Sequence, residues 1–208
     1  MQYNKDIHRR RSIRLKDYDY SQTGAYFVTV CSWNKGCVFG DIVDGALQIN
    51  ECGQIVQDEW MKTADIRTNV ELDEFAVMPN HIHGIIVLAD NVVLDVGNEF
   101  LNGAAHRQCR GEAVPRPDRR KERRATHRVA PTLISGSVGA IVGQFKSNVA
   151  RRINEIHNTL GRPVWQRNYY EHIIRDEGEL NRIREYIINN PARWAEDENN
   201  PINAKRDV

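Results

Sequence analysis

Two histidines one residue apart, His81 and His83, open an apolar run rich in isoleucine and valine. The composition of this run, and the Pro79-Asn80 pair that precedes it, predict a buried strand. Alternate side chains of a strand point to the same face, about 6.6 Å apart along it, so two imidazoles placed in this way can bind one divalent metal. The spacing alone leaves open the alternative that both are core histidines.

A tyrosine and an asparagine, Tyr186 and Asn190, stand four residues apart in a segment with helical spacing, and Pro191 ends that helix. A tyrosine beside a metal can act as a covalent nucleophile, although its phenol, with a pKa of about 10, needs a cation or a base to deprotonate. We expect Tyr186 to be that nucleophile and the Asn190 amide oxygen to be a third metal ligand. The ordinary alternatives are a half-buried helix tyrosine and an asparagine that finishes a helix.

Two other tyrosines compete for the same role. Tyr169 and Tyr170 lie near Glu171 and His172, and in a strand they point to opposite faces. Neither has an amide at helical spacing, so we rank both behind Tyr186. We expect His172 to be structural and not a metal ligand.

Composition indicates one domain with extensions, or two very small ones, because the chain has 208 residues and 40% of them are hydrophobic. The first ten residues do not form a secretory signal, and no stretch is long and apolar enough to predict a membrane span. Four cysteines without metal-binding spacing are typical of reduced thiols in a cytoplasmic protein.

The net charge of +1 conceals a strong segregation of charge. Residues 1–16 carry a net +5 and residues 107–128 a net +6, which leaves −10 on the rest of the chain. Basic arms of this kind commonly contact phosphate backbones, and the alternative for residues 107–128 is a solvated, disordered tract.

The expected elements alternate between strands and helices, with a hairpin that turns at Asp44-Gly45. They are a strand over 25–31, the hairpin over 38–43 and 46–50, a helix over 51–64, strands over 70–78 and from 81, a helix over 135–157, a strand region over 169–175 and a helix over 177–190. This order predicts an α+β fold, a ferredoxin-like split βαβ sandwich with helices on one face of an antiparallel sheet and an extra C-terminal helix that carries a site.

Three ordered segments resemble a known family. Met78–Gly84, Trp165–Gln166 with Tyr170–Arg175, and Tyr186–Pro191 are similar to motifs of the single-tyrosine HUH transposases, and most of all to the REP-associated tyrosine transposases of bacteria. The resemblance runs from about residue 10 to 195, apart from roughly 91–130.

The resemblance implies a nuclease that cuts single-stranded DNA, often at the foot of a hairpin. Under it, His81 and His83 hold Mg²⁺ or Mn²⁺, Tyr186 forms a 5′-phosphotyrosine, and Asn190 supplies the third ligand where glutamine is usual in insertion-sequence members. The partner is then single-stranded or hairpin DNA, with no membrane, and the protein acts in the bacterial cytoplasm, nucleoid-associated when bound to DNA, as a monomer or homodimer. The alternative is a non-catalytic nucleic-acid-binding protein with a vestigial metal site.

DNA contacts are expected from basic side chains of the N-terminal arm, the long helix and the last strand. These are Arg9, Arg10, Arg11, Arg14, Lys146, Arg151, Arg152 and Arg175. We place the basic arm at 1–20, the HUH nuclease domain at 21–195 with a basic insertion at about 91–131, and a tail at 196–208.

Deleting residues 107–128 should preserve the fold, because this tract offers a core almost no apolar side chains. It should weaken binding to single-stranded DNA and flatten its salt dependence, since each phosphate contact contributes about 0.7 to the slope of log affinity against log salt. Affinity measured across a salt series for both proteins tests this. Equal slopes would show that the tract does not touch DNA.

Overall fold

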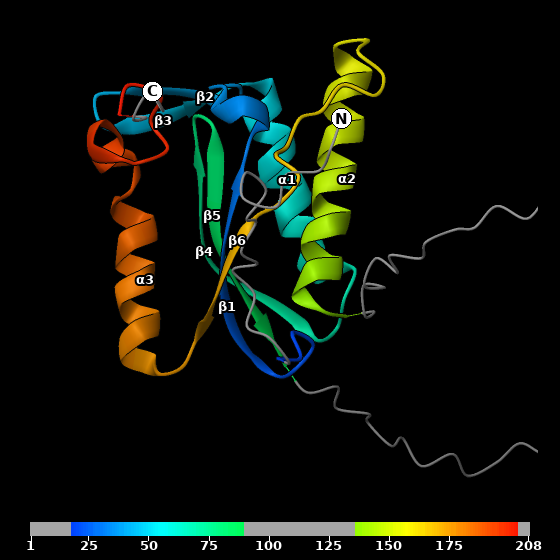
Figure 1. Cartoon of the computed structure of the whole chain (residues 1–208), viewed down its shortest axis with the longest axis vertical. Helices are drawn as coiled ribbons and strands as arrows, with labels where there is room; N and C mark the ends of the chain where they lie inside the picture. Colours follow the sequence, from blue (N-terminus) through cyan, green and yellow to red (C-terminus); the bar gives the residue numbers. More distant parts are fainter. Residues whose placement is uncertain (1–17, 90–135, 204–208) are drawn as a thin grey trace, which may run out of the picture. The chain divides into compact units, whose positions relative to one another are not determined.

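Four antiparallel strands form the sheet that carries the two histidines (Figure 1). Their order is β4 (Val70–Met78), β5 (His81–Leu88), β1 (Gly24–Cys31) and β6 (Tyr170–Ile174). This computed structural model describes residues 18–89 and 136–203 of the chain. The sequential strands β4 and β5 pair with each other, and β1 lies between β5 and β6, so the predicted α+β fold with an antiparallel sheet is confirmed.

A small hairpin, β2 (Gly40–Val43) and β3 (Ala46–Ile49), precedes the first long helix. It turns at Asp44-Gly45 as predicted, and both turn residues have positive φ, 53° and 77°. Positive φ at both central residues gives a two-residue loop the twist that its strands need, and glycine adopts it without strain. Between β1 and this hairpin lies the short 3-10 helix η1 (Trp33–Lys35).

Helices α1 (Glu51–Asp65) and α2 (Val138–Ile156) cover one face of the sheet (Figure 1). Asn50 caps the first, accepting a hydrogen bond from the Gly53 amide, and Ser137 caps the second. The main core lies between these helices and the sheet, and its fully buried members include Tyr26, Val28, Val30, Ile82, Ile86, Val56 and Val142.

Helix α3 (Glu177–Asn189) lies on the opposite face of the sheet (Figure 1). Its Ile187 is fully buried in a second, smaller core with Phe27 and Ile85. Arg184 of the helix binds both carboxylate oxygens of Asp73 in β4, through Nε at 2.8 Å and Nη2 at 2.5 Å. The apolar contact and this bidentate pair together set the position of α3 on the sheet.

Residues on both sides of the range 21–195 pack into the folded body. The ring of Tyr20 contacts the rings of Tyr18 and Tyr26, and the Tyr18 hydroxyl lies 3.2 Å from the Tyr26 hydroxyl. After α3 a 3-10 helix, η2 (Pro191–Glu196), leads into a segment in which Asp197 and Asn199 are buried.

Arg9, Arg10, Arg11 and Arg14 lie outside the described residues, as do the tract 107–128 and the proposed insertion at 91–131. Within the part of the chain that the structure describes, no helix is long and apolar enough to cross a membrane.

Substituting Gly84 by alanine should destabilise the fold, because the new methyl group would point directly into the indole ring of Trp60, closer than two carbon atoms can approach. Overpacking of this kind costs about 1–3 kcal/mol in free energy of unfolding, which urea denaturation measures. A Gly84→Ala/Trp60→Leu double variant should lose less stability than the two single variants added together. Strict additivity would mean that the contact does not cause the loss.

Candidate active site

His81 and His83 project from the same face of β5 into a buried site. They are 0% and 2% exposed, and their Nε2 atoms lie 3.0 Å apart. Ile82, between them, points to the opposite face and belongs to the main core. The alternation of the strand thus brings two ring nitrogens to one point.

Asn80, in the turn between β4 and β5, determines which nitrogen of His81 carries the proton. Its Nδ2 donates to the backbone carbonyls of Lys35 at 2.9 Å and Asn199 at 2.7 Å. Its Oδ1 is therefore the atom that faces His81 Nδ1, at 2.8 Å, and an amide oxygen can only accept. Nδ1 must carry the hydrogen, which leaves a lone pair on Nε2.

His83 is oriented in the same way from the neighbouring strand. Thr29 stands opposite His83 in β1, and its hydroxyl lies 2.8 Å from His83 Nδ1. The Nε2 atoms of the two rings are 3.0 Å apart, a separation that a proton or a cation between them can bridge. Burial lowers the pKa of both histidines to about 3, and the charge of Lys35 acts in the same direction on His81. Both rings are therefore neutral near pH 7, the form that binds metals.

Asp197 completes the cluster from the segment after η2. Its Oδ2 lies 3.7 Å from His81 Nε2. The backbone N–H of Asn199 donates to its Oδ1 at 2.5 Å and so orients the carboxylate. The ligand atoms of His81, His83 and Asp197 all lie within 4.8 Å of one another. Sequence reasoning missed Asp197, because it follows the proline that ends the tyrosine helix and no periodic pattern relates it to the histidines.

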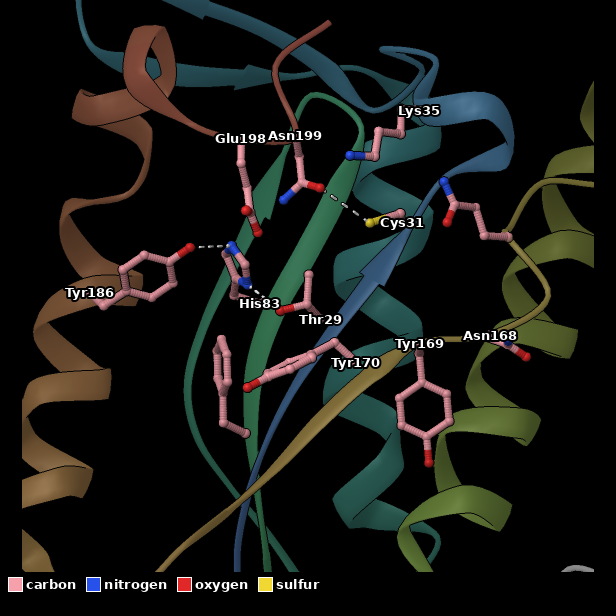
Figure 2. A pocket seen from close by; sticks show the side chains of 12 residues that line it. Thr29, Cys31, Lys35, His83, Asn168, Tyr169, Tyr170, Tyr186, Glu198 and Asn199 are labelled. Atoms are coloured by element: carbon pink, nitrogen blue, oxygen red, sulfur yellow. Dashed lines mark hydrogen bonds between the residues drawn. The ribbon is translucent and has the colours of Figure 1, made fainter. Parts of the chain in front are cut away.

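Tyr186 reaches the same point from α3. Its hydroxyl lies 3.3 Å from His83 Nε2 (Figure 2), and its ring is 45% exposed. Burial raises the pKa of this phenol, as does the negative charge of Asp197, whereas a hydrogen bond from Asn190 lowers it. The phenol is therefore protonated near neutral pH.

Asn190 lies at the end of α3, 4% exposed, and shares a pocket with Tyr186 and Asp197. Its Oδ1 is buried and has no hydrogen-bond partner within the described parts of the chain. A buried amide oxygen without a partner is costly unless a further ligand binds it. The ligation of a metal by Asn190 stays a prediction, and its unpartnered oxygen is available for it.

These donors fit a divalent cation. Two neutral imidazoles, a carboxylate and a buried amide oxygen without a hydrogen-bond partner among the described residues are a donor set that can hold a divalent metal ion. The 3.0 Å approach of the two Nε2 atoms also fits a shared cation.

The competing tyrosines occupy different surroundings. The Tyr169 hydroxyl donates to Glu171 at 2.6 Å, and Tyr170 lies on the face of the sheet that carries His83. His172 contacts Glu179 of α3 at 2.8 Å, which agrees with the structural role expected of it.

Of the described residues expected to bind DNA, most are engaged within the fold. Arg152 pairs with Asp58 and Glu59 of α1, and Arg151 with Glu155 on its own helix. Lys146 donates to the carbonyls of residues 166 and 167, and Arg175 is exposed. The first three belong to α2, on the face of the sheet away from the two histidines.

Replacing His81 or His83 by alanine should abolish Mn²⁺ binding, measured by calorimetric titration, because each variant removes one of two nitrogen ligands. Asp197→Asn should weaken binding more than Asn190→Ala, since it removes the charge that balances the cation. The control is a variant that loses another imidazole from the same face of the sheet, which reveals any loss of binding that comes from a disturbed structure alone.

That control is His172→Ala, which removes an imidazole from the same face of the sheet but outside the cluster. It should bind Mn²⁺ with unchanged affinity. Unchanged binding in the His81 and His83 variants would instead show that these are core histidines. Equal losses in the Asp197 and Asn190 variants would show that the carboxylate contributes no more to metal binding than the amide does.

Comparison with known proteins identifies one relative by sequence and one solved structure with a similar fold. No family model matches the chain. A protein of Haemophilus influenzae, described only as uncharacterized, is 40% identical over 199 residues, which cover 94% of this chain and 96% of that protein. A REP-associated tyrosine transposase solved bound to a REP hairpin superposes with a TM-score of 0.53 at 14% identity, over 89% of this chain and 77% of the transposase. The chain therefore belongs to one family with the Haemophilus influenzae protein, and its fold is that of a tyrosine transposase.

Proposed function

We propose that this protein is a metal-dependent transposase that cuts and rejoins single-stranded DNA through a covalent bond to Tyr186. The observation that carries the proposal is the approach of the Tyr186 hydroxyl to within 3.3 Å of a buried histidine pair. A nucleophile, a cluster of metal ligands and an open pocket beside them are the parts that phosphoryl transfer needs. The fold shared with a transposase that was solved with a DNA hairpin supports DNA as the substrate.

His81, His83 and Asp197 would hold Mg²⁺ or Mn²⁺, with the Asn190 oxygen at hand. The cation would act as a Lewis acid that polarises a non-bridging oxygen of the scissile phosphate. Asn80 and Thr29 keep the two imidazoles turned toward this point through their Nδ1 atoms. Such outer partners fix the orientation of metal-binding histidines.

Tyr186 Oη then attacks phosphorus in line. The Oη–P bond forms while the bond from phosphorus to the 3′-oxygen breaks, and the proton lost by the phenol is balanced by the proton that the leaving 3′-oxygen gains. The product is a 5′-phosphotyrosine with a free 3′-hydroxyl, and attack by that hydroxyl reverses the step. Burial and the charge of Asp197 both raise the Tyr186 pKa, so the phenol carries its proton before the attack.

Tyr186→Phe should abolish formation of the protein–DNA adduct, because it removes the attacking oxygen and keeps the ring that packs against His83 and Phe27. The assay incubates the protein with hairpin-bearing single-stranded DNA and Mn²⁺, or with a chelator, and detects the adduct on a denaturing gel. Tyr170→Phe, which removes a phenol from the same face of the sheet, should still form it.

An adduct in the Tyr186→Phe protein would assign the nucleophile to another residue. Metal-dependent DNA binding without any adduct in the wild-type protein would favour the non-catalytic alternative.

A further inference from the structure

Beside Tyr186 the site opens into a pocket of about 520 Å³ (Figure 2). Phe27, Thr29 and Cys31 line it from β1, and Tyr186 and His83 stand on one side. Ligand pockets range from about 300 to 1,000 Å³, so the space admits a nucleotide. A DNA strand attacked by Tyr186 must place the nucleotide that adjoins the attacked phosphate in or beside this pocket.

Tyr170 gives the pocket an aromatic wall. It stands opposite Thr29 in the sheet, which in turn stands opposite His83, so the three side chains form a row across the face that carries the site. Its ring is 46% exposed, and the contact with Phe27, edge to face at 6.2 Å between centroids, orients it. Half-exposed rings in this setting are platforms on which unpaired bases stack.

Lys35 gives the pocket a cation. It has a positive φ of 53° and follows Asn34, at 54°, so two consecutive non-glycine residues adopt a left-handed conformation that is rare and strained. The Lys35 carbonyl accepts a hydrogen bond from the Asn80 amide that orients His81. This bond anchors the strained turn to the histidine site, while the ammonium makes no ion pair with any residue that the structure describes.

The remaining polar lining includes the carboxylate of Glu198 and three side-chain amides, those of Gln166, Asn168 and Asn199. The Asn199 side chain accepts a hydrogen bond from the Cys31 thiol, whereas the side chains of Gln166 and Asn168 make no hydrogen bond to the described residues. The Gln166 backbone amide donates to the Cys31 carbonyl of β1 at 2.9 Å. Amide groups both donate and accept, and they read the edges of bases that are not paired.

We propose that this pocket holds the nucleotide that adjoins the attacked phosphate, with the Tyr170 ring against its base and the Lys35 ammonium beside a phosphate oxygen. The proposal rests on the proposed function and adds to it a requirement: a base must be unpaired and present at one position next to the cut. Lys35 and Tyr170 position the substrate, and neither takes part in the transfer of the phosphoryl group.

The experiment uses the hairpin oligonucleotide that forms the Tyr186 adduct, and the released strand maps the cut. Copies with a single abasic site on either side of the cut keep every phosphate and lose one base. The rate of adduct formation is measured on each copy, at subsaturating DNA, for the wild-type protein and for Tyr170→Ala, Tyr170→Phe, Lys35→Met and Lys62→Met.

Tyr170→Ala should react about tenfold more slowly than the wild type on intact DNA, as expected for a lost base stack. Its rate should fall little further when the adjoining base is absent. Tyr170→Phe keeps the aromatic ring, so it should lose much less of the rate than Tyr170→Ala does. Lys35→Met should slow the reaction to a similar degree on intact and abasic DNA, because its phosphate contact does not depend on the base. Lys62→Met removes a charge from α1, on the other face of the sheet, and should react as the wild type does.

Two results overturn the proposal while the proposed function stands. They are wild-type rates in Tyr170→Ala and Lys35→Met, and a Tyr170→Ala loss that is the same on intact DNA and on both abasic copies. No adduct with the wild-type protein would instead remove the proposed function, and the nucleotide pocket with it.

Discussion

The orientation of one buried amide, that of Asn80, decides what His81 can bind. Because Asn80 Nδ2 donates to two backbone carbonyls, its oxygen is left to face the imidazole, and His81 must offer a bare Nε2 to the site. One of those carbonyls belongs to η1 and the other to the segment after η2. The Asn80 side chain thus joins the turn between β4 and β5 to two remote stretches of chain. His81 presents its bare Nε2 to the site only when both of those stretches are packed against the turn.

Helix α3 is positioned by forces that are separate from the chemistry. Neighbouring residues of a helix point about 100° apart, so burial of Ile187 against Phe27 and Ile85 turns the adjacent Tyr186 toward the histidines. The pair of Arg184 with Asp73 prevents the helix from sliding along β4. Apolar packing sets the rotation of the helix and the ion pair sets its position along the sheet, and the hydroxyl of Tyr186 is placed by both.

Local periodicity predicted much of this arrangement. The two-residue period of a strand placed His81 and His83 together, and the helical period placed Tyr186 and Asn190 on one side of α3. The contribution of Asp197 could not be predicted in this way, because it depends on how the chain turns after Pro191, and no pattern in the sequence specifies that turn. Lys35 was missed for the same reason, since its place in the site follows from a strained turn whose residues are not glycine.

The order of the site residues along the chain has a consequence for folding of the protein. All four strands of the sheet are complete at Ile174, whereas Tyr186, Asn190 and Asp197 follow it. The site can therefore be completed only after α3 has packed its Ile187 against Phe27 and Ile85 on a sheet that is already formed. Under the proposed chemistry, assembly of the DNA-cutting site would be a late step of folding, dependent on the sheet that precedes it.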